Sequence, residues 1–271
     1  MEQNRSMQRL PFALSIPHGG VETPEELSGL VVSTREDMRE DIDHLTREIF
    51  SVPDGMVAAQ ISFEIARTFV DLNRHPDAWG ADHADGVVKS LTHLHRPVFS
   101  RFPTRATVEG MLERLYQPYH QWLAARTRDP EVVLLLDCHS MAPASLSGSP
   151  DRPGRSRPLF NLGHRGGASA PLPLVQSLRE VMAEVYQIPL DEVRIDCPFN
   201  GGYITQTYHS PTSHAIQIEF NRAFYLGEEE GRACPALGAA TLASWREKFV
   251  RCLQLFHQRA YLDRPLVSRN L

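Results

Sequence analysis

The sequence has no run of about 20 apolar residues, so no segment is expected to cross a bilayer as a helix. It also lacks an excess of positive charge, since 28 Lys and Arg stand against 33 Asp and Glu, for a formal net charge of -5. An acidic surface attracts neither nucleic acid nor a membrane, and we expect neither as a partner. Residues 1–10 are too polar for a secretory signal peptide, which favours a cytoplasmic protein.

Cysteine is scarce and irregularly spaced. The cysteines form no CxxC pair and match neither a disulfide framework nor a zinc knuckle, so we expect reduced thiols. They are Cys138, Cys197, Cys234 and Cys252. Histidine, in contrast, occurs 12 times in 271 residues. Because histidine is the commonest metal ligand and titrates near neutral pH, its positions are the first place to look for chemistry.

The hydrophobic pattern predicts an α/β fold. Apolar residues make up 42% of the chain, as in an ordinary soluble enzyme, and no internal repeat or low-complexity tract is present. Short apolar runs alternate with segments of helical period, which is typical of a mostly parallel sheet covered on both faces. The expected strands span 12–16, 57–62, 68–72, 132–136, 193–197 and 214–220; the expected helices span 38–49, 108–127 (kinked or split at Pro118), 172–186 and 241–261.

The length of the chain fits one domain, which we assign to residues 1–271. Residues 75–104 hold many His, Pro and Asp residues and few periodic apolar ones, and they predict a lid or loop insertion. Residues 142–157 are rich in Pro, Ser, Gly and Arg and predict an exposed loop.

Polar residues follow three of the expected strands directly. Open α/β sheets bind ligands beyond the carboxyl ends of their strands, so these polar clusters are candidates for one shared site. The clusters occupy residues 17–20, 71–74 and 137–140.

Two histidines in these clusters are candidate metal ligands. His18 stands on a turn before two glycines, where a histidine that only caps backbone groups is the alternative. His139 follows a buried strand, where an unpaired polar side chain is costly. Asp137 lies on the same side of an extended chain and can orient the ring of His139, although a buried Asp–His pair without a metal is equally compatible with this pattern.

Glu219 is the candidate general base. In the expected strand 214–220 it shares one face with Ala215 and Gln217. A glutamate in such a strand needs a partner or has a raised pKa, as a base that activates a metal-bound water does. The alternative is a glutamate on an edge strand that faces water.

Arg67, Asn73 and Arg74 form a group suited to anions. Two guanidinium groups and an amide can hold a carboxylate through paired hydrogen bonds. For either arginine alone, an ion pair with Asp71 or Glu64 is the alternative.

Five motifs, in this order, resemble those of the N-formylglutamate amidohydrolases, and the resemblance covers residues 13 to about 225. That family is related in fold to zinc carboxypeptidases and aspartoacylase-like deacylases. The resemblance therefore implies a three-layer α/β sandwich with a mixed, mostly parallel central sheet. The motifs are SIPHGG at 15–20, VDLNR at 70–74, LDCHS at 136–140, NGGYI at 200–204 and AIQIE at 215–219.

The resemblance also implies roles for individual residues and a reaction. One zinc ion would hydrolyse N-formyl-L-glutamate to formate and L-glutamate, a reaction of histidine degradation, with a small anionic molecule as the only partner of a monomer or small homo-oligomer. The implied roles are zinc ligation by His18 and His139, carboxylate binding by Arg67, Asn73 and Arg74, acid–base catalysis by Glu219, and closure over the substrate by the turn that contains Gly202 and Tyr203.

The third zinc ligand departs from the carboxypeptidase pattern. Those enzymes place a glutamate three residues after the first histidine, and this chain has Val21 there. Glu22 is one residue further on, but the two glycines before it disfavour a helical pairing with His18. The formylglutamate family instead tends to have an aspartate before its first helix. Asp43 matches this position and Asp41 lies close by; we choose Asp43, with Asp41 and Glu22 as the alternatives. A helix N-cap is the alternative role for Asp43.

Two other functions compete with this one. A zinc carboxypeptidase or peptidoglycan-fragment amidase of the same fold needs an extended groove, so it requires 75–104 to be open. A catalytically silent binding protein has no need of His18, His139 and Glu219 together. Residues 61–68 also depart from the Ser-Arg pattern usual before the Asp-Leu-Asn-Arg motif, and this leaves the acyl group open.

Overall fold

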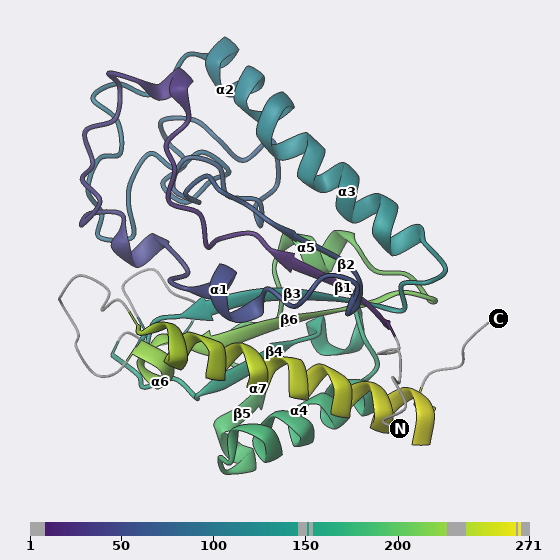
Figure 1. The fold of residues 1–271 in the computed structure, drawn as a ribbon. Coiled ribbons are helices and arrows are strands. Elements are labelled where there is room, and N and C mark those ends of the chain that lie inside the picture. Colours follow the sequence, from purple (N-terminus) through teal and green to yellow (C-terminus); the bar gives the residue numbers. More distant parts are fainter. Residues whose placement is uncertain (1–8, 146–150, 152–153, 227–236, 264, 267–271) are drawn as a thin grey trace.

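A computed structural model describes residues 9–145, 151, 154–226, 237–263 and 265–266 (Figure 1). Its centre is a six-stranded sheet in the order β2-β1-β3-β6-β4-β5. The first four of these strands are parallel to one another, and β4 pairs with β6 in the antiparallel direction and with β5 in the parallel one. The strands are β1 Leu10–Ile16, β2 Val57–Ser62, β3 Leu134–Met141, β4 Phe160–Gly163, β5 Val193–Ile195 and β6 His214–Asn221.

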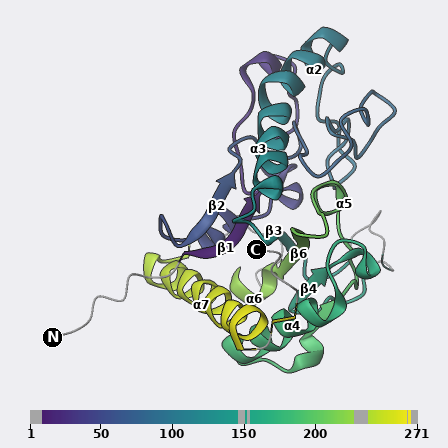
Figure 2. The same cartoon turned by 90° about the vertical axis from the view of Figure 1, so that its right-hand side faces the viewer.

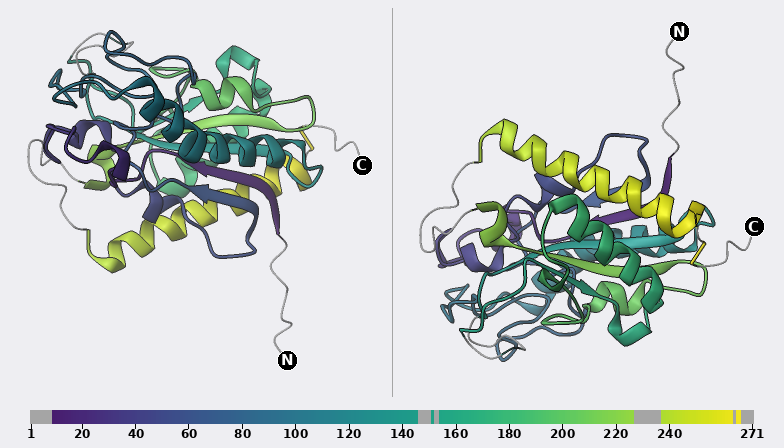
Figure 3. Two further views of the ribbon diagram at one scale, coloured as in Figure 1. Left: turned by 90° about the horizontal axis from the view of Figure 1, so that it is seen from above. Right: turned by 90° about the horizontal axis from the view of Figure 1, so that it is seen from below.

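Helices cover both faces of the sheet, as Figures 2 and 3 show. Helices α4 and α7 pack on one face together with α1, and the continuous α2–α3 rod lies over the other face. The three-layer α/β sandwich and the mixed, mostly parallel sheet predicted from the sequence are therefore confirmed. The helices are α1 Thr46–Phe50, α2 Arg105–Met111, α3 Gln117–Arg128, α4 Leu172–Tyr186, α5 Tyr203–Thr207, α6 Arg222–Leu226 and α7 Ala239–His257.

The alternation of side chains along the strands builds a separate core on each face. Along β6, Ile216, Ile218 and Phe220 point into the core beneath α4 and α7. Ala215 points into the opposite core, toward α2 and α3. Because side chains alternate with a period of two, polar residues further along β6 on the Ala215 face lie beyond the end of this second core.

Most of the expected elements are present, although several have different bounds. The expected helix 108–127 is one rod in which a π-helical turn, Leu112–Tyr116, joins α2 to α3. Pro118 occupies the first turn of α3, where its missing N–H is tolerated. Strand β3 runs on to Met141 instead of ending at Leu136, because β6 pairs with it as far as Asn221.

Two predicted elements are wrong. Residues 68–72 form turns instead of a strand. Their buried side chains Phe69, Val70 and Leu72 still pack into the core on the side of α2 and α3. The predicted helix 38–49 is broken, because the α-helix begins only at Thr46 and Leu45 has a left-handed φ of 58°. Both segments are held by contacts with distant parts of the chain. Strand β4 was not expected at all.

The segment 75–104 contains no helix or strand, yet it is closely packed. Val87, Val88 and Val98 are fully buried. Isolated β-bridges within the segment, such as that between Trp79 and Val88, join its parts. Of the predicted loop 142–157, residues 146–150 and 152–153 lie outside the described residues, whereas Ala142, Ser145 and Arg157 are buried.

The described residues also bear on the expectations for membrane-spanning helices and for disulfides. Among them, no helix is long and apolar enough to cross a membrane. Cys138, Cys197 and Cys252 are free thiols, as expected, and Cys234 lies outside the described residues.

Candidate active site

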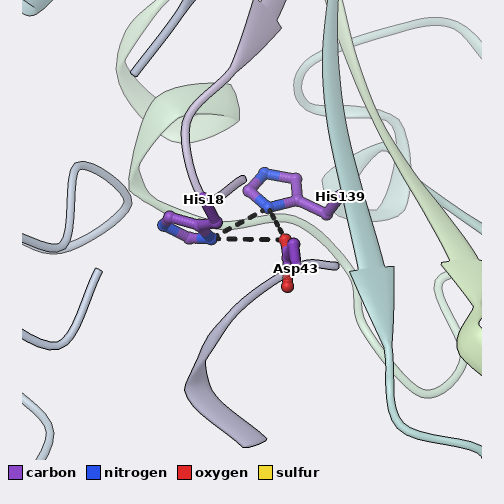
Figure 4. Close-up of side chains that lie close together, drawn as sticks. All are labelled: His18, Asp43 and His139. Atoms are coloured by element: carbon purple, nitrogen blue, oxygen red, sulfur yellow. Dashed lines mark hydrogen bonds and ion pairs between the residues drawn. The ribbon is translucent and has the colours of Figure 1, made fainter. Parts of the chain in front are cut away.

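Side chains from β1, β3 and β6 meet at the carboxyl edge of the sheet. His18 lies two residues beyond the end of β1, and His139 lies within β3. Strand β6 places Glu219 directly beside His139 in the parallel register. Asp43 reaches the same point from the irregular segment before α1 (Figure 4). The three polar clusters predicted from the sequence, 17–20, 71–74 and 137–140, therefore contribute to one site, although 71–74 follows turns instead of a strand.

His18, Asp43 and His139 form a compact buried cluster. The Nδ1 atoms of the two histidines are 3.1 Å apart, and Asp43 Oδ2 lies 3.2 Å from Nδ1 of His139 and 3.6 Å from Nδ1 of His18. Four-coordinate zinc, with bonds of about 2.0–2.2 Å, places its ligand atoms about 3.3–3.5 Å apart. Within the described residues this is the one group of three His, Cys, Asp or Glu side chains that can hold a metal ion.

Two buried carboxylates orient the histidine rings. Nε2 of His18 donates to Asp71 Oδ1, and Nε2 of His139 donates to Asp137 Oδ2, each at 2.8 Å. With the proton on Nε2, both Nδ1 lone pairs face each other and Asp43. Such an arrangement is unfavourable unless a proton or a metal ion lies among the three atoms, and carboxylate–histidine pairs of this kind are typical of zinc sites.

The charges around the cluster favour a cation there. Burial disfavours the charged form of His139, but the carboxylates of Asp137 and Asp43 outweigh burial and raise its pKa well above the usual value. Burial likewise opposes ionisation of Asp43, but hydrogen bonds from His139 and His18 lower its pKa. The field that holds a proton on His139 in the free protein would also stabilise a metal ion, so the donor set fits zinc.

Glu219 is buried beside the cluster with one oxygen left unpaired. Gln217 Nε2 donates to Oε1 of Glu219 at 2.7 Å, whereas Oε2 has no partner among the described residues. Burial raises the pKa of Glu219 to about 8, although His139 acts in the opposite direction. A carboxylate with such a pKa and a free oxygen can exchange a proton near neutral pH.

These side chains line a cavity of about 440 Å³. Four arginines border it, two of them expected from the sequence and two not. The arginines are Arg67, Arg74, Arg157 and Arg222. A negative ligand can therefore be attracted here in spite of the acidic net charge of the chain.

Arg67 and Arg74 each make an ion pair at the rim of the cavity. Arg67 donates from Nε and Nη2 to Asp71 Oδ2, at 3.2 and 2.7 Å, so the ion-pair alternative is confirmed with Asp71. Its Nη1 makes no hydrogen bond within the described residues. Arg74 Nη2 donates to Asp85 at 2.5 Å. Glu64 pairs with Arg47 instead and lies away from the cavity.

Asn73 connects the cluster to the glycine turn at 200–204. Its Oδ1 accepts the Ile204 N–H at 2.8 Å, and its Nδ2 lies 3.4 Å from Asp137 Oδ2. A Cβ atom on Gly202 would come within 2.4 Å of the Asn73 amide, so only glycine permits this close approach. Tyr203 lies outside the cavity lining, and its ring packs against His75 and His120 instead.

The structure separates the three candidates for the third ligand. Asp43 lies in the cluster. Asp41 is buried but pairs with Lys89 Nζ at 2.8 Å. Glu22 is exposed and forms an isolated bridge with Ile65. The choice of Asp43 over Asp41 and Glu22 therefore agrees with the geometry.

Sequence reasoning missed two of the arginines that line the cavity. Arg222 follows Glu219 by three residues, so its position just past a strand end was a usable signal. Arg157 belongs to a segment expected to be exposed, yet it is buried, makes two hydrogen bonds to Asp151 and stacks on Phe199 with 4.9 Å to the ring centre. No local pattern predicts that burial.

Comparison with solved structures supports the fold. The chain is similar to the N-formylglutamate amidohydrolase from Ralstonia eutropha JMP134, with 22% identity, a TM-score of 0.74, and coverage of 93% of this chain and 95% of that one. It is also similar to a gene product from Agrobacterium tumefaciens, with 15% identity, a TM-score of 0.60, and coverage of 92% and 89%. None of the curated proteins compared with the chain matches it significantly.

A family model matches most of the chain. The model describes N-formylglutamate amidohydrolases, and it matches residues 10–226. This range includes all six strands and every residue of the His18–Asp43–His139 cluster, together with Glu219. The chain therefore belongs to the N-formylglutamate amidohydrolase family.

Proposed function

We propose that this amidohydrolase is a zinc enzyme that cleaves the amide bond of an N-acylated acidic amino acid, with N-formyl-L-glutamate as its first candidate substrate. The observation that carries the proposal is the buried His18–Asp43–His139 cluster with the unpaired oxygen of Glu219 beside it. The arginines around the cavity support an anionic substrate. The products would be formate and L-glutamate, released in the cytoplasm as a step of histidine degradation.

The chain's own residues supply binding, orientation and proton transfer. When bound by His18, Asp43 and His139, zinc supplies Lewis acidity for the scissile carbonyl and for a water molecule. Oε2 of Glu219 accepts the proton of the attacking water and passes it to the leaving amine. Nη1 of Arg67 is available to stabilise the developing oxyanion or a substrate carboxylate.

The packing of 75–104 supports a small substrate over an extended one. Asp85 and His93 of this segment line the cavity. Buried Lys89 ties the segment down through Asp41 at 2.8 Å and Asp85 at 2.9 Å. A packed wall of this kind favours a small substrate over the extended groove that a carboxypeptidase or peptidoglycan-fragment amidase needs. We propose that the segment acts as a lid.

Metal analysis and an assay with N-formyl-L-glutamate test the proposal directly. Freshly purified protein is expected to contain about one zinc per chain and to release formate and glutamate. The assay also separates an enzyme from a catalytically silent binding protein. Protein that holds no zinc and gains no activity when metal is added would overturn the proposal. We expect the protein to be a monomer or a small homo-oligomer.

Substituting Gly202 with alanine is expected to lower kcat/KM by roughly 10- to 100-fold, because a displaced group in the site costs about that much. The new methyl group would push on the Asn73 amide, since the added Cβ atom would lie only 2.4 Å from it. Gly110→Ala is the matched control, since no atom lies within 4 Å of its Cβ position. Activity of Gly202→Ala within twofold of that of Gly110→Ala would show that the close approach is unimportant.

A further inference from the structure

Asp43 lies on an irregular stretch of chain, in contrast to His139 on its strand. The stretch begins after a 3₁₀ turn, Arg39–Asp41, and ends at Thr46, where α1 starts. Within it, Leu45 has a φ of 58°, a left-handed conformation that is unfavourable for any residue with a Cβ atom. A ligand on such a segment keeps its place only if other parts of the protein hold the backbone around it.

Two side chains of α6 hold the backbone on either side of Asp43. Arg222 Nη1 donates to the carbonyl oxygen of Ile42 at 3.0 Å. Tyr225 OH donates to the carbonyl oxygen of His44 at 2.7 Å. Both side chains are buried, so these hydrogen bonds are shielded from water. The two residues that flank Asp43 are thus fixed from the same helix.

A second contact of Arg222 strengthens this arrangement. Its Nη2 donates to Glu40 Oε2 at 2.7 Å, so one guanidinium spans the segment from Glu40 to Ile42. Asp43 itself donates its N–H to the carbonyl oxygen of His18 at 3.1 Å. Together, these contacts determine where the carboxylate of Asp43 lies relative to the histidines.

Helix α6 is itself anchored to the strand that bears Glu219. It follows β6 directly, and Asn221 Oδ1 accepts the Ala223 N–H at 3.0 Å. Figure 1 shows α6 at the end of the sheet where the chain leads into α1. Strand β6 and α6 therefore form one continuous unit that carries Glu219 and also holds the segment of Asp43.

We propose that Arg222 and Tyr225 are positioning residues for Asp43, and that they set the affinity of the site for its metal. This inference rests on the proposed function, since it requires a metal at His18, Asp43 and His139. Residues that orient metal ligands typically change metal affinity by 10- to 100-fold when they are replaced. Arg222 and Tyr225 act on the ligand through the backbone beside it.

Tyr225→Phe is the cleanest variant, because it removes a single oxygen atom. Its zinc dissociation constant, measured by competition with a chelator, is expected to rise about 10-fold. Arg222→Met is expected to raise it further. Tyr186→Phe is the matched control: Tyr186 is a buried tyrosine of the same aromatic cluster, and its hydroxyl has no partner among the described residues. Its zinc affinity is expected to equal that of the wild type.

A double-variant cycle separates positioning from a general loss of structure. Asp43→Asn removes the ligand charge, so adding Tyr225→Phe to Asp43→Asn is expected to cause no further loss of zinc affinity. The absorption spectrum of the cobalt-substituted protein gives an independent readout, and Tyr225→Phe is expected to shift it toward that of Asp43→Asn. Circular dichroism of the metal-free variants checks that they fold.

Two results distinguish a failure of the proposed metal centre from a failure of the positioning role. Equal zinc affinity in the wild type and Asp43→Asn would overturn the metal centre of the proposed function. Weaker binding by Asp43→Asn, together with wild-type affinity in Tyr225→Phe, would overturn only the positioning role. If Arg222→Met does not fold, Tyr225→Phe decides the matter alone.

Discussion

Replacing His139 with alanine is expected to remove zinc from the protein and to lower hydrolysis of N-formyl-L-glutamate by about three orders of magnitude or more. The imidazole supplies one of three buried donors, and its Nδ1 lies 3.1–3.2 Å from the other two. Two ligands rarely retain zinc in a protein, because a catalytic site normally has three. Elemental analysis of the purified variant and kcat/KM with a range of added zinc measure both effects.

A second buried histidine provides the control for this substitution. His164 is as buried as His139 and also contacts a carboxylate, Asp196, but it lies outside the cluster. His164→Ala is therefore expected to keep its zinc. Chelation should inactivate the wild type and added zinc should restore it, whereas neither treatment should change His139→Ala. A His139→Ala protein that holds one zinc per chain would remove His139 from the ligand set.

The strand ends were predictable because the relevant signals are local. The alternation in 214–220 placed Glu219 on the Ala215 face, away from Ile216 and Ile218, and the sheet preserves that division between its two cores. Apolar runs ending in polar residues likewise predicted where His18 and His139 would lie. What alternation alone could not provide was the pairing of Glu219 with His139, since register depends on both strands.

The irregular segments were less predictable because long-range contacts determine them. The apolar residues within 69–72 resemble a strand in composition. In the structure they pack into the core on the side of α2 and α3 from turns, and backbone hydrogen bonds to Val87 and Lys89 hold these turns. The spacing of apolar residues around Asp43 predicted a helix. Helix α6, about 180 residues away in sequence, instead holds that stretch in an irregular conformation through hydrogen bonds. The family resemblance indicated an aspartate in this region but left Asp41 open as an alternative to Asp43. In the structure Asp41 forms an ion pair with Lys89 instead.

Changing Glu219 to glutamine is expected to lower kcat by about 10²- to 10⁴-fold, the usual contribution of a general acid–base group, and to leave zinc binding intact. Glutamine has the same shape, and its oxygen can still accept the hydrogen bond that Gln217 donates to Oε1 of Glu219. An amide, however, cannot take the proton from water. Parallel measurements of kcat, KM and zinc content test this expectation, and wild-type kcat would exclude Glu219 as the base.

The same variant is expected to be more stable than the wild type at alkaline pH when both are free of metal. Burial raises the pKa of Glu219 from its ordinary value of 4.5 to about 8, so the folded protein holds a proton that the unfolded chain has released between these pH values. Stability of the wild type therefore falls as pH rises from about 4.5 to 8, relative to a variant that cannot ionise. Thermal unfolding of the two proteins should coincide near pH 4.5 and diverge toward pH 8, with Glu219→Gln melting higher. Identical melting curves at pH 8 would show that folding does not raise the pKa of Glu219.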